Sequence, residues 1–193
     1  MILRAQYFSP SRTSSLLFLA AILLLSGCAG LRETSCEQFR EVRQETDYTT
    51  QYRLLEPDTD NAARRFKPLP KGAVAVVRQY KMEVNTPEIK PCNHLKIQKE
   101  IYLLRKNDKN LILEEIREFY TADGVLIATK SEFVEDQMRT SGYYAGSTPL
   151  PIPEKAPPGK YRIVSKLVMK RKNTSRTTIL ARVSANFQVI ARN

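Results

Sequence analysis

Acidic side chains lie close together at two places in the sequence and could supply catalytic carboxylates. The two groups are Glu114, Glu115, Glu118 and Glu132, Glu135, Asp136. Paired carboxylates hydrolyse glycosidic bonds, and carboxylate oxygens also bind calcium. The surrounding residues alternate between apolar and polar as in strands with one wet face. The simpler interpretation therefore places these acids in solvent, opposite lysines and arginines.

Other signatures of catalysis are missing from the sequence. The single histidine, His94, follows Cys92 at Cys-x-His spacing, but two ligands do not make a zinc site. No glycine-rich phosphate loop, Gly-x-Ser-x-Gly or Cys-x-x-Cys occurs. We expect no catalytic residue, no metal and no cofactor, and an envelope hydrolase is the least favoured function.

The amino-terminal residues form a three-part pattern that directs export. Arg4 and Arg12 precede an unbroken apolar run from Leu16 to Leu25, and the small residues of Ser26-Gly27 lead to Cys28. Ten apolar residues span only about 15 Å as a helix, which is too short to cross a bilayer. We expect residues 1–27 to be a cleaved signal peptide.

The four residues from Leu25 to Cys28 resemble the lipobox of bacterial lipoproteins. This resemblance implies that the Cys28 thiol carries a diacylglyceryl group and that the mature chain begins there, with a further acyl chain on its amino group. Two or three acyl chains make such an anchor effectively permanent. The residue after the cysteine is Ala29 instead of the aspartate that retains lipoproteins at the inner membrane, so the outer membrane is favoured.

The mature chain is strongly basic. Two of the 31 basic residues and none of the 20 acidic ones precede Cys28, which leaves a net charge of +9 from Cys28 onward. Such a chain is attracted to anionic surfaces. An envelope location makes nucleic acid an unlikely partner and favours anionic envelope polymers, phospholipid headgroups or acidic proteins, although solubility alone also explains the charge.

Two cysteines remain once Cys28 is assigned to lipid. Cys36 and Cys92 form an even pair in an oxidising compartment, so a disulfide is favoured over two separate thiols. It would close a loop of 57 residues, worth about 4 kcal/mol in the chain-entropy model.

Composition divides the mature chain into two parts. Residues 28–71 are polar and charged, and we interpret them as a tether with a short helix over Ser35 to Thr46, where Thr34 and Glu37 have capping-box spacing. From Gly72 onward, short runs of β-branched and aromatic residues alternate with turn signals. Residues 72–193 therefore form the folded domain.

The folded domain is predicted to be mainly β. Asp123-Gly124 between two apolar runs indicates a hairpin, and alternating runs on both sides of residues 170–177 indicate another. About seven strands without βαβ alternation predict a single antiparallel β-sandwich.

Three motifs resemble those of immunoglobulin-like and fibronectin type III-like domains. They are Phe119 to Val125, Pro157 to Ile163 and the closing Asn186 to Val189. The resemblance implies that the strand with Gly-x-Tyr-x-Ile is the penultimate one and that Tyr161 occupies its buried or corner position. These motifs mark strands and not chemistry, and the tryptophan of antibody domains is absent.

Two loops are candidate contact sites. The first is a basic hairpin tip with Lys170, Arg171, Lys172 and Arg176, which suits anionic groups or an acidic partner. The favoured interpretation of these basic residues is a solvated turn that protects a sheet edge from aggregation. The second is a connection over residues 141–153 whose Tyr143 and Tyr144 could contact a partner or pack over the sheet.

These observations predict a lipid-anchored, non-catalytic envelope protein that binds or scaffolds other components through its end loops. The alternative, from another class, is an accessory factor for export or surface assembly whose sheet edge holds a client strand.

Overall fold

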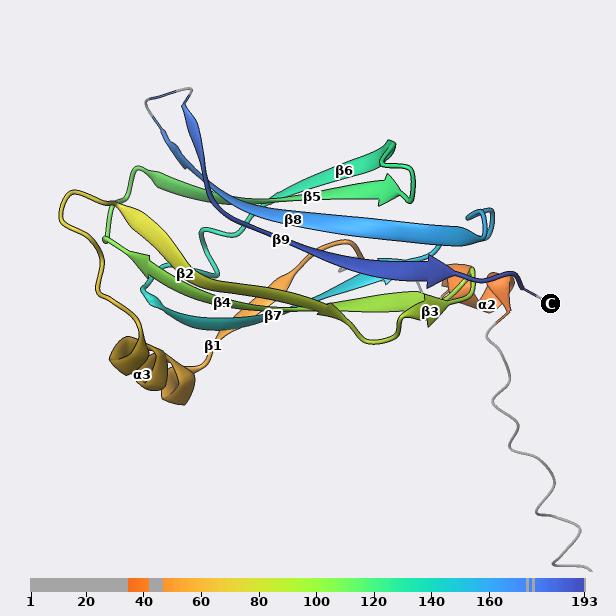
Figure 1. Ribbon diagram of the computed structural model, residues 1–193, viewed down its shortest axis with the longest axis horizontal. Helices are drawn as coiled ribbons and strands as arrows, with labels where there is room; N and C mark the ends of the chain where they lie inside the picture. Colours follow the sequence, from red (N-terminus) through yellow and green to blue (C-terminus); the bar gives the residue numbers. More distant parts are fainter. Residues whose placement is uncertain (1–34, 42–46, 173, 175, 193) are drawn as a thin grey trace, which may run out of the picture. The chain divides into compact units, whose positions relative to one another are not determined.

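The computed structural model describes residues 35–41, 47–172, 174 and 176–192, which form two helices and nine strands (Figure 1). In chain order these elements are α2 (Cys36–Glu41), β1 (Gln51–Leu54), α3 (Glu56–Arg65), β2 (Ala75–Val84), β3 (Glu88–Ile89), β4 (His94–Arg105), β5 (Leu111–Thr121), β6 (Leu126–Phe133), β7 (Gly142–Pro151), β8 (Gly159–Arg171) and β9 (Thr177–Val189). The helix predicted over Ser35 to Thr46 is present as α2, and the rest of that range, 42–46, lies outside the described residues. Strands β1, β3 and β7 were not indicated by the sequence.

The strands form two facing sheets (Figure 1). One has the order β1-β7-β4-β2 and the other β3-β9-β8-β5-β6. All pairs are antiparallel except the short parallel pair of β3 with β9. The predicted fold class, a mainly β immunoglobulin-like sandwich, is confirmed.

The predicted turns lie where the sequence indicated them. Gly124 has φ of +86°, which suits glycine, and it closes the hairpin between β5 and β6. Residues 159–163 begin β8, the penultimate strand, as the family resemblance implied. The Tyr161 hydroxyl donates a 2.7 Å hydrogen bond to the Pro157 carbonyl, the corner geometry of such domains.

Residues 47–71 differ from the predicted tether because they are part of the sandwich. Strand β1 pairs with β7, and α3 packs beside the same strand. The glycines of β7, which indicated a loop, make this pairing possible. A Cβ on Gly146 would lie 2.4 Å from the Tyr52 ring, and one on Gly142 would lie 2.3 Å from the Leu54 side chain.

Helix α2 is fastened to one end of the sandwich. The Gln38 amide donates to the Ser35 hydroxyl and the Ser35 amide donates to the Gln38 side chain, both at 3.1 Å. This capping box is one residue later than predicted. Phe39 packs on the His94 ring with centroids 4.9 Å apart, and the predicted disulfide joins Cys36 to Cys92 with Cα atoms 5.1 Å apart.

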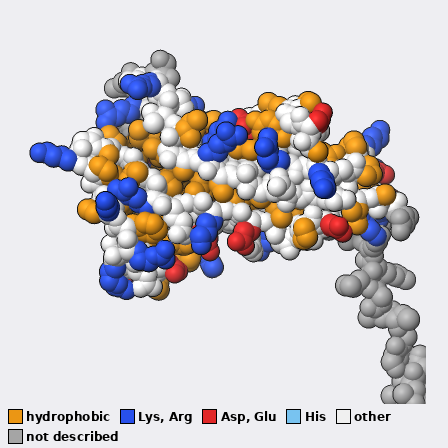
Figure 2. Space-filling view, viewed as in Figure 1, with side chains coloured by type: hydrophobic (Ala, Val, Ile, Leu, Met, Phe, Trp, Pro, Cys, Tyr) orange, Lys and Arg blue, Asp and Glu red, His pale blue; other side chains and the backbone are white. Residues whose placement is uncertain are grey.

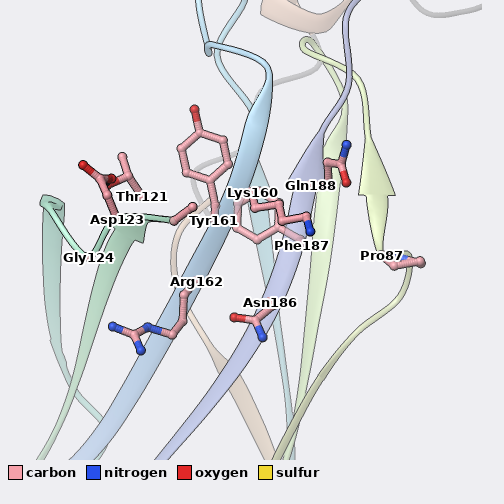
Figure 3. Close-up of a pocket in the computed structure, with 11 residues that line it drawn as sticks. Pro87, Thr121, Asp123, Gly124, Lys160, Tyr161, Arg162, Asn186, Phe187 and Gln188 are labelled. Atoms are coloured by element: carbon pink, nitrogen blue, oxygen red, sulfur yellow. The ribbon is translucent and has the colours of Figure 1, made fainter.

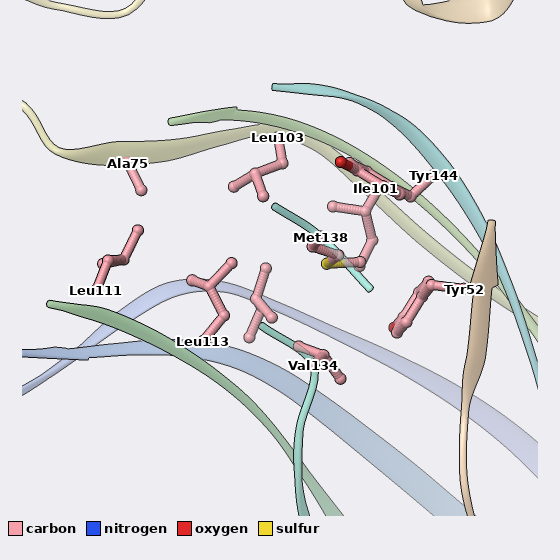
Figure 4. Close-up of a cluster of buried hydrophobic side chains, with 10 residues drawn as sticks. Tyr52, Ala75, Ile101, Leu103, Leu111, Leu113, Val134, Met138 and Tyr144 are labelled. Atoms are coloured by element: carbon pink, nitrogen blue, oxygen red, sulfur yellow. The ribbon is translucent and has the colours of Figure 1, made fainter. Parts of the chain in front are cut away.

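The core contains two apolar clusters with a polar layer between them. Figure 4 shows the first cluster, which includes Leu103 and Leu113, while the second includes Ile97 and Ile163. Buried polar residues lie between these clusters along the strands. Lys99 follows Ile97 on β4 and precedes Ile101, and Ser165 lies likewise between Ile163 and Leu167 on β8.

We call this layer the buried polar cluster and define it as Thr50, Lys99, Glu115, Arg117, Thr148 and Ser165. The Lys99 and Glu115 side chains form an ion pair with no exposed surface. The Thr50 hydroxyl donates to Glu115 at 2.9 Å and accepts from Lys99 at 3.0 Å and from Arg117. A residue from the predicted tether thus completes the network at its centre.

Burial and charge pairing act in opposite directions on the two partners. Burial lowers the pKa of Lys99 to about 8, although Glu115 favours its charged form. Burial would raise the pKa of Glu115, but Lys99 and Arg117 outweigh it and hold that pKa at about 2. Both groups are therefore charged at neutral pH. Burial, followed by the charge of Glu115, raises the pKa of Tyr52 and Tyr80, so both hydroxyls stay protonated as donors to this carboxylate.

The first prediction concerns the pH dependence of stability. Because the folded pKa of Glu115 lies below the ordinary value of 4.5, its contribution is present above pH 4.5 and disappears as the pH falls toward about 2. We expect Glu115→Gln to lower the free energy of unfolding at pH 7 by roughly 3 kcal/mol, because the buried Lys99 loses its ion-pair partner and Arg117 keeps only Glu132. Denaturant unfolding should show that the difference in free energy of unfolding between the variant and the native protein disappears as the pH falls from 4.5 to 2.

Glu83→Gln is the control for this experiment because Glu83 is exposed on β2. Its stability should follow the native protein at every pH. A constant gap between Glu115→Gln and the native protein across the acid range would contradict the assignment.

The second prediction concerns the disulfide. Reduction should lower the free energy of unfolding by about 2–4 kcal/mol, because the unfolded chain regains the entropy of a long loop. Thermal unfolding with and without dithiothreitol measures this. The variant Cys36→Ser/Cys92→Ser should already have the lower melting temperature and should not respond to the reductant, whereas a response would point to an effect outside the bridge.

Candidate functional site

The outward face of the five-stranded sheet carries a row of cations. Side chains alternate along β8, so that Ile163, Ser165 and Leu167 point into the core and the residues between them point outward. We call the outward cations the basic face and define it as Lys160, Arg162, Lys166 and Lys170 of β8 with Arg182 of β9. Figure 2 shows Lys and Arg side chains distributed over the side on which Figure 1 draws β8 and β9.

Acids of the neighbouring strand neutralise the middle of this face. Lys166 donates to Glu118 and Lys170 donates to Glu114, both on β5. The hydrogen bond from Lys166, followed by that from Tyr120, lowers the pKa of Glu118. In the described residues, Lys160 and Arg162 form no ion pair, so this end of the row keeps net positive charge. Arg182 lies on β9 opposite Lys166, where its charge also lowers the pKa of Glu118.

A polar hollow of about 660 Å³ lies at one end of the basic face (Figure 3). Strand register brings its residues together: Lys160 lies opposite Gln188, and Arg162 lies opposite Asn186. The turn with Asp123 forms the other wall. The Arg162 guanidinium lies over the Tyr120 ring at 5.2 Å from its centroid, a cation–π contact that orients it.

The hollow can bind polar groups but lacks a catalytic pair. Its amides, guanidinium and ammonium offer donors and acceptors to hydroxyl, carboxylate or phosphate oxygens. Asp123 is the one carboxylate among its lining residues, and it accepts a hydrogen bond from Thr121. Acid–base hydrolysis of glycosides requires two carboxyl groups, so this arrangement suits binding.

The predicted basic hairpin lies at the other end of the same strand. Lys170 and Arg171 end β8, Lys172 follows, and Arg176 precedes β9; the last three are exposed. Arg171 lies 3.8 Å from Asp108, which balances part of its charge. Lys160 and Lys170 are separated by ten residues of strand, or about 33 Å, so the hairpin extends the basic face along a line.

The two tyrosines of the predicted contact site do not share one surface. Tyr143 and Tyr144 lie on β7 and point to opposite sides of it. Tyr144 is 2% exposed within the core. The Tyr143 hydroxyl donates to Glu100 at 2.6 Å and accepts from Gln79 at 2.7 Å. Burial, followed by the bond to Glu100, raises the pKa of Tyr143 to about 12.

The predicted acidic groups are divided by strand alternation. Glu114 and Glu118 lie on the outward side of β5 beside Lys170 and Lys166, but Glu114 is only 7% exposed and Glu115 is fully buried, so the prediction that these two lie in solvent is wrong. In the second group, Glu132 pairs with Arg117 at 3.1 Å. Each of these carboxylates faces a cation, which explains why the acids are close in sequence without forming a catalytic pair.

Metal-ligand chemistry has no support in the part of the chain that the structure describes. It contains no group of three or more side chains able to hold a metal ion. Cys92 is bonded to Cys36, and His94 Nε2 lies 3.1 Å from Asp47.

The polar hollow was not identified from the sequence. Period-two alternation indicated that Arg162, Lys166, Lys170 and Arg182 are solvent-facing, but it could not indicate that they share a face. That depends on the register between β8, β9 and β5.

The expected lipid site, Cys28, and the signal peptide lie outside the described residues. Of the helices in the described ranges, none is long and apolar enough to cross a membrane.

The fold and the basic face define an immunoglobulin-like domain with a candidate ligand-binding surface. No protein-family model and no curated protein matches this chain. Among solved structures, the chain is similar to the C-terminal domain of Wzt, with 16% identity over 60% of this chain and 73% of that chain and a TM-score of 0.43. An immunoglobulin-like protein from Pseudomonas aeruginosa has 16% identity over 61% and 98%, with a TM-score of 0.36.

A conjugative transposon lipoprotein from Bacteroides eggerthii is also similar, with 13% identity over 57% of this chain and 97% of that chain and a TM-score of 0.24. These similarities concern the sandwich fold and do not extend to function.

Proposed function

We propose that this protein is a non-catalytic binding module of the bacterial cell envelope that holds an anionic polymer along its basic face. The observation that carries the proposal is the line of cations from Lys160 to the hairpin at Arg176, presented by one rigid sheet. A strand-bound row about 33 Å long matches an extended chain of repeating anionic units better than a compact small molecule.

The two ends of the row have different roles in this proposal. The polar hollow binds one repeat by direct hydrogen bonds from Arg162, Asn186 and Gln188. The hairpin attracts the rest of the polymer through long-range charge, which is sensitive to salt. The neutralised middle, where Lys166 meets Glu118, provides a surface along which the polymer lies.

The location of the module follows from its amino terminus. A lipid on Cys28 would attach the domain to a membrane, and Ala29 favours the outer one. An oxidising compartment agrees with the Cys36–Cys92 disulfide. No partner from the cytoplasm, such as nucleic acid, is part of this proposal.

The exposed edge of the five-stranded sheet favours a second candidate function, that of an export or assembly accessory. Among the strands that the structure describes, β6 pairs with β5 alone, and its side chains Leu126 and Ile127 are 51% and 54% exposed. An edge of this kind accepts an added strand from a client protein. Capture of an apolar peptide in β6 register, with no binding of polyanions, would favour this alternative.

The third prediction tests polymer binding with dextran sulfate as the probe. We expect Lys160→Glu/Arg162→Glu to raise the Kd for dextran sulfate by about tenfold or more in 50 mM salt. The reason is that two cations able to bind phosphate or sulfate are replaced by anions that repel the polymer. Titration calorimetry at 50 mM and 200 mM salt should also show a shallower salt dependence for this variant.

The charge-matched control is Lys67→Glu/Lys71→Glu, since both lysines are exposed in the segment before β2, away from the basic face. It changes the net charge by the same amount and should alter the Kd by less than about threefold. Equal losses in both variants would mean that dextran sulfate responds to net charge and not to this face.

A further inference from the structure

A second hollow lies between strand β6 and the end of β7, and its lining is mainly apolar. It has a volume of about 580 Å³, within the range of about 300–1,000 Å³ that ligand pockets occupy. Ile127 and Ala128 of β6 form one wall, and residues 150–153 at the end of β7 form the other. The side chain of Phe119 lies between them. We call this feature the apolar groove.

The charges around the apolar groove have one sign. Lys130 and Lys155 are exposed and belong to its lining, which contains no aspartate or glutamate. Glu154, which lies in sequence between the lining residues Pro153 and Lys155, is paired with Arg40 of α2 at 2.6 Å. In the part of the chain that the structure describes, neither lysine forms an ion pair.

We propose that the apolar groove binds one acyl chain of an anionic phospholipid, with the lipid phosphate between Lys130 and Lys155. Apolar walls suit the hydrocarbon, and two cations at the rim suit the headgroup. Lysine stems pack along hydrocarbon while their ammonium groups stay in water, which allows both lysines to meet a phosphate at the rim.

The length of chain before the disulfide supports a membrane lipid as the occupant. The Cys92 amide donates to the Ile152 carbonyl at 2.9 Å, so the disulfide is fastened to a wall of the groove. Eight residues separate Cys36 from Cys28, and they extend to at most about 29 Å. This step rests on the proposed lipid anchor, which would keep the groove within that distance of the bilayer.

The experiment uses the full mature protein, purified with its lipid and checked at Cys28 by intact mass. It is reconstituted into phosphatidylcholine vesicles that contain phosphatidylglycerol with a diazirine near the end of one acyl chain. After illumination, mass spectrometry of peptides locates the adducts. We expect them on residues 126–130 and 150–157.

Two variants test the groove by different routes. Ala128→Trp fills the groove with a larger side chain. Lys130→Glu/Lys155→Glu reverses the charge at the rim and changes no core residue. Ala128→Trp should lower the adduct yield at these peptides by about tenfold. The double lysine variant should lower it by about 25-fold, because each of two cations near an anionic surface contributes roughly a factor of five. Lys67→Glu/Lys71→Glu is the charge-matched control and should stay within twofold of the native yield.

Several results would overturn the proposal. One is equal labelling by a phosphatidylcholine that carries the same diazirine. Another is a set of adducts spread over the surface whose yield does not change in Ala128→Trp. A third is protein–protein crosslinking at β6, which would show that a second copy of the chain occupies the groove. Dextran sulfate binding by Ala128→Trp is measured in parallel and should be unchanged. If the native protein binds dextran sulfate but gives no adducts at these peptides, the groove alone is contradicted. If it gives the adducts but does not bind dextran sulfate, the basic face alone is contradicted.

Discussion

The buried ion pair between Lys99 and Glu115 is the interaction on which the arrangement of this domain depends. Two charges without exposed surface require partners for every remaining donor and acceptor, because an unpaired buried charge costs several kcal/mol. Those partners come from both sheets and from Thr50, which precedes β1. Satisfying one ion pair thus aligns the sheets with each other and draws the amino-terminal segment into the fold.

The same constraint connects the core to the proposed binding surface. Strand β5 carries Glu115 on its inner side and Glu114 and Glu118 on its outer side, so fixing the inner residue also fixes the outer ones. The outer glutamates position Lys166 and Lys170. A register error of one residue in β5 would turn Glu114 and Glu118 toward the apolar clusters and Leu113 outward. The polar layer therefore specifies register where apolar packing alone would allow slippage.

The disulfide and helix α2 give the domain a defined end. They join the chain at Cys36 to the loop at Cys92, beside the mouth of the apolar groove. Together with β1, this connection makes residues 47–71 part of the folded domain, where composition had indicated a tether. A lipid on Cys28, as proposed, would place the groove near the membrane, while the basic face extends along the sheet.

Much of the fold follows from the sequence because local rules determine it. Alternation predicted β2, β4, β8 and β9, and Asp123-Gly124 predicted a hairpin whose glycine adopts positive φ. Pairing of Cys36 with Cys92 followed from cysteine number once Cys28 was assigned to lipid. The expected anchor at Cys28 lies outside the described residues and stays a prediction.

Contacts between distant residues decided the remainder. The composition of residues 47–71 is that of a polar linker, and only the space above Gly142 and Gly146 explains why β1 enters the sheet. Glu115 and Arg117 have the pattern of wet-face residues, because alternation gives the side of a strand but not which side is buried. The polar hollow likewise requires the register of three strands. Sequence therefore indicated the longer alternating strands and favoured the disulfide, whereas tertiary structure decided that β1, β3 and β7 join the sheets, which charges are buried and which form a surface.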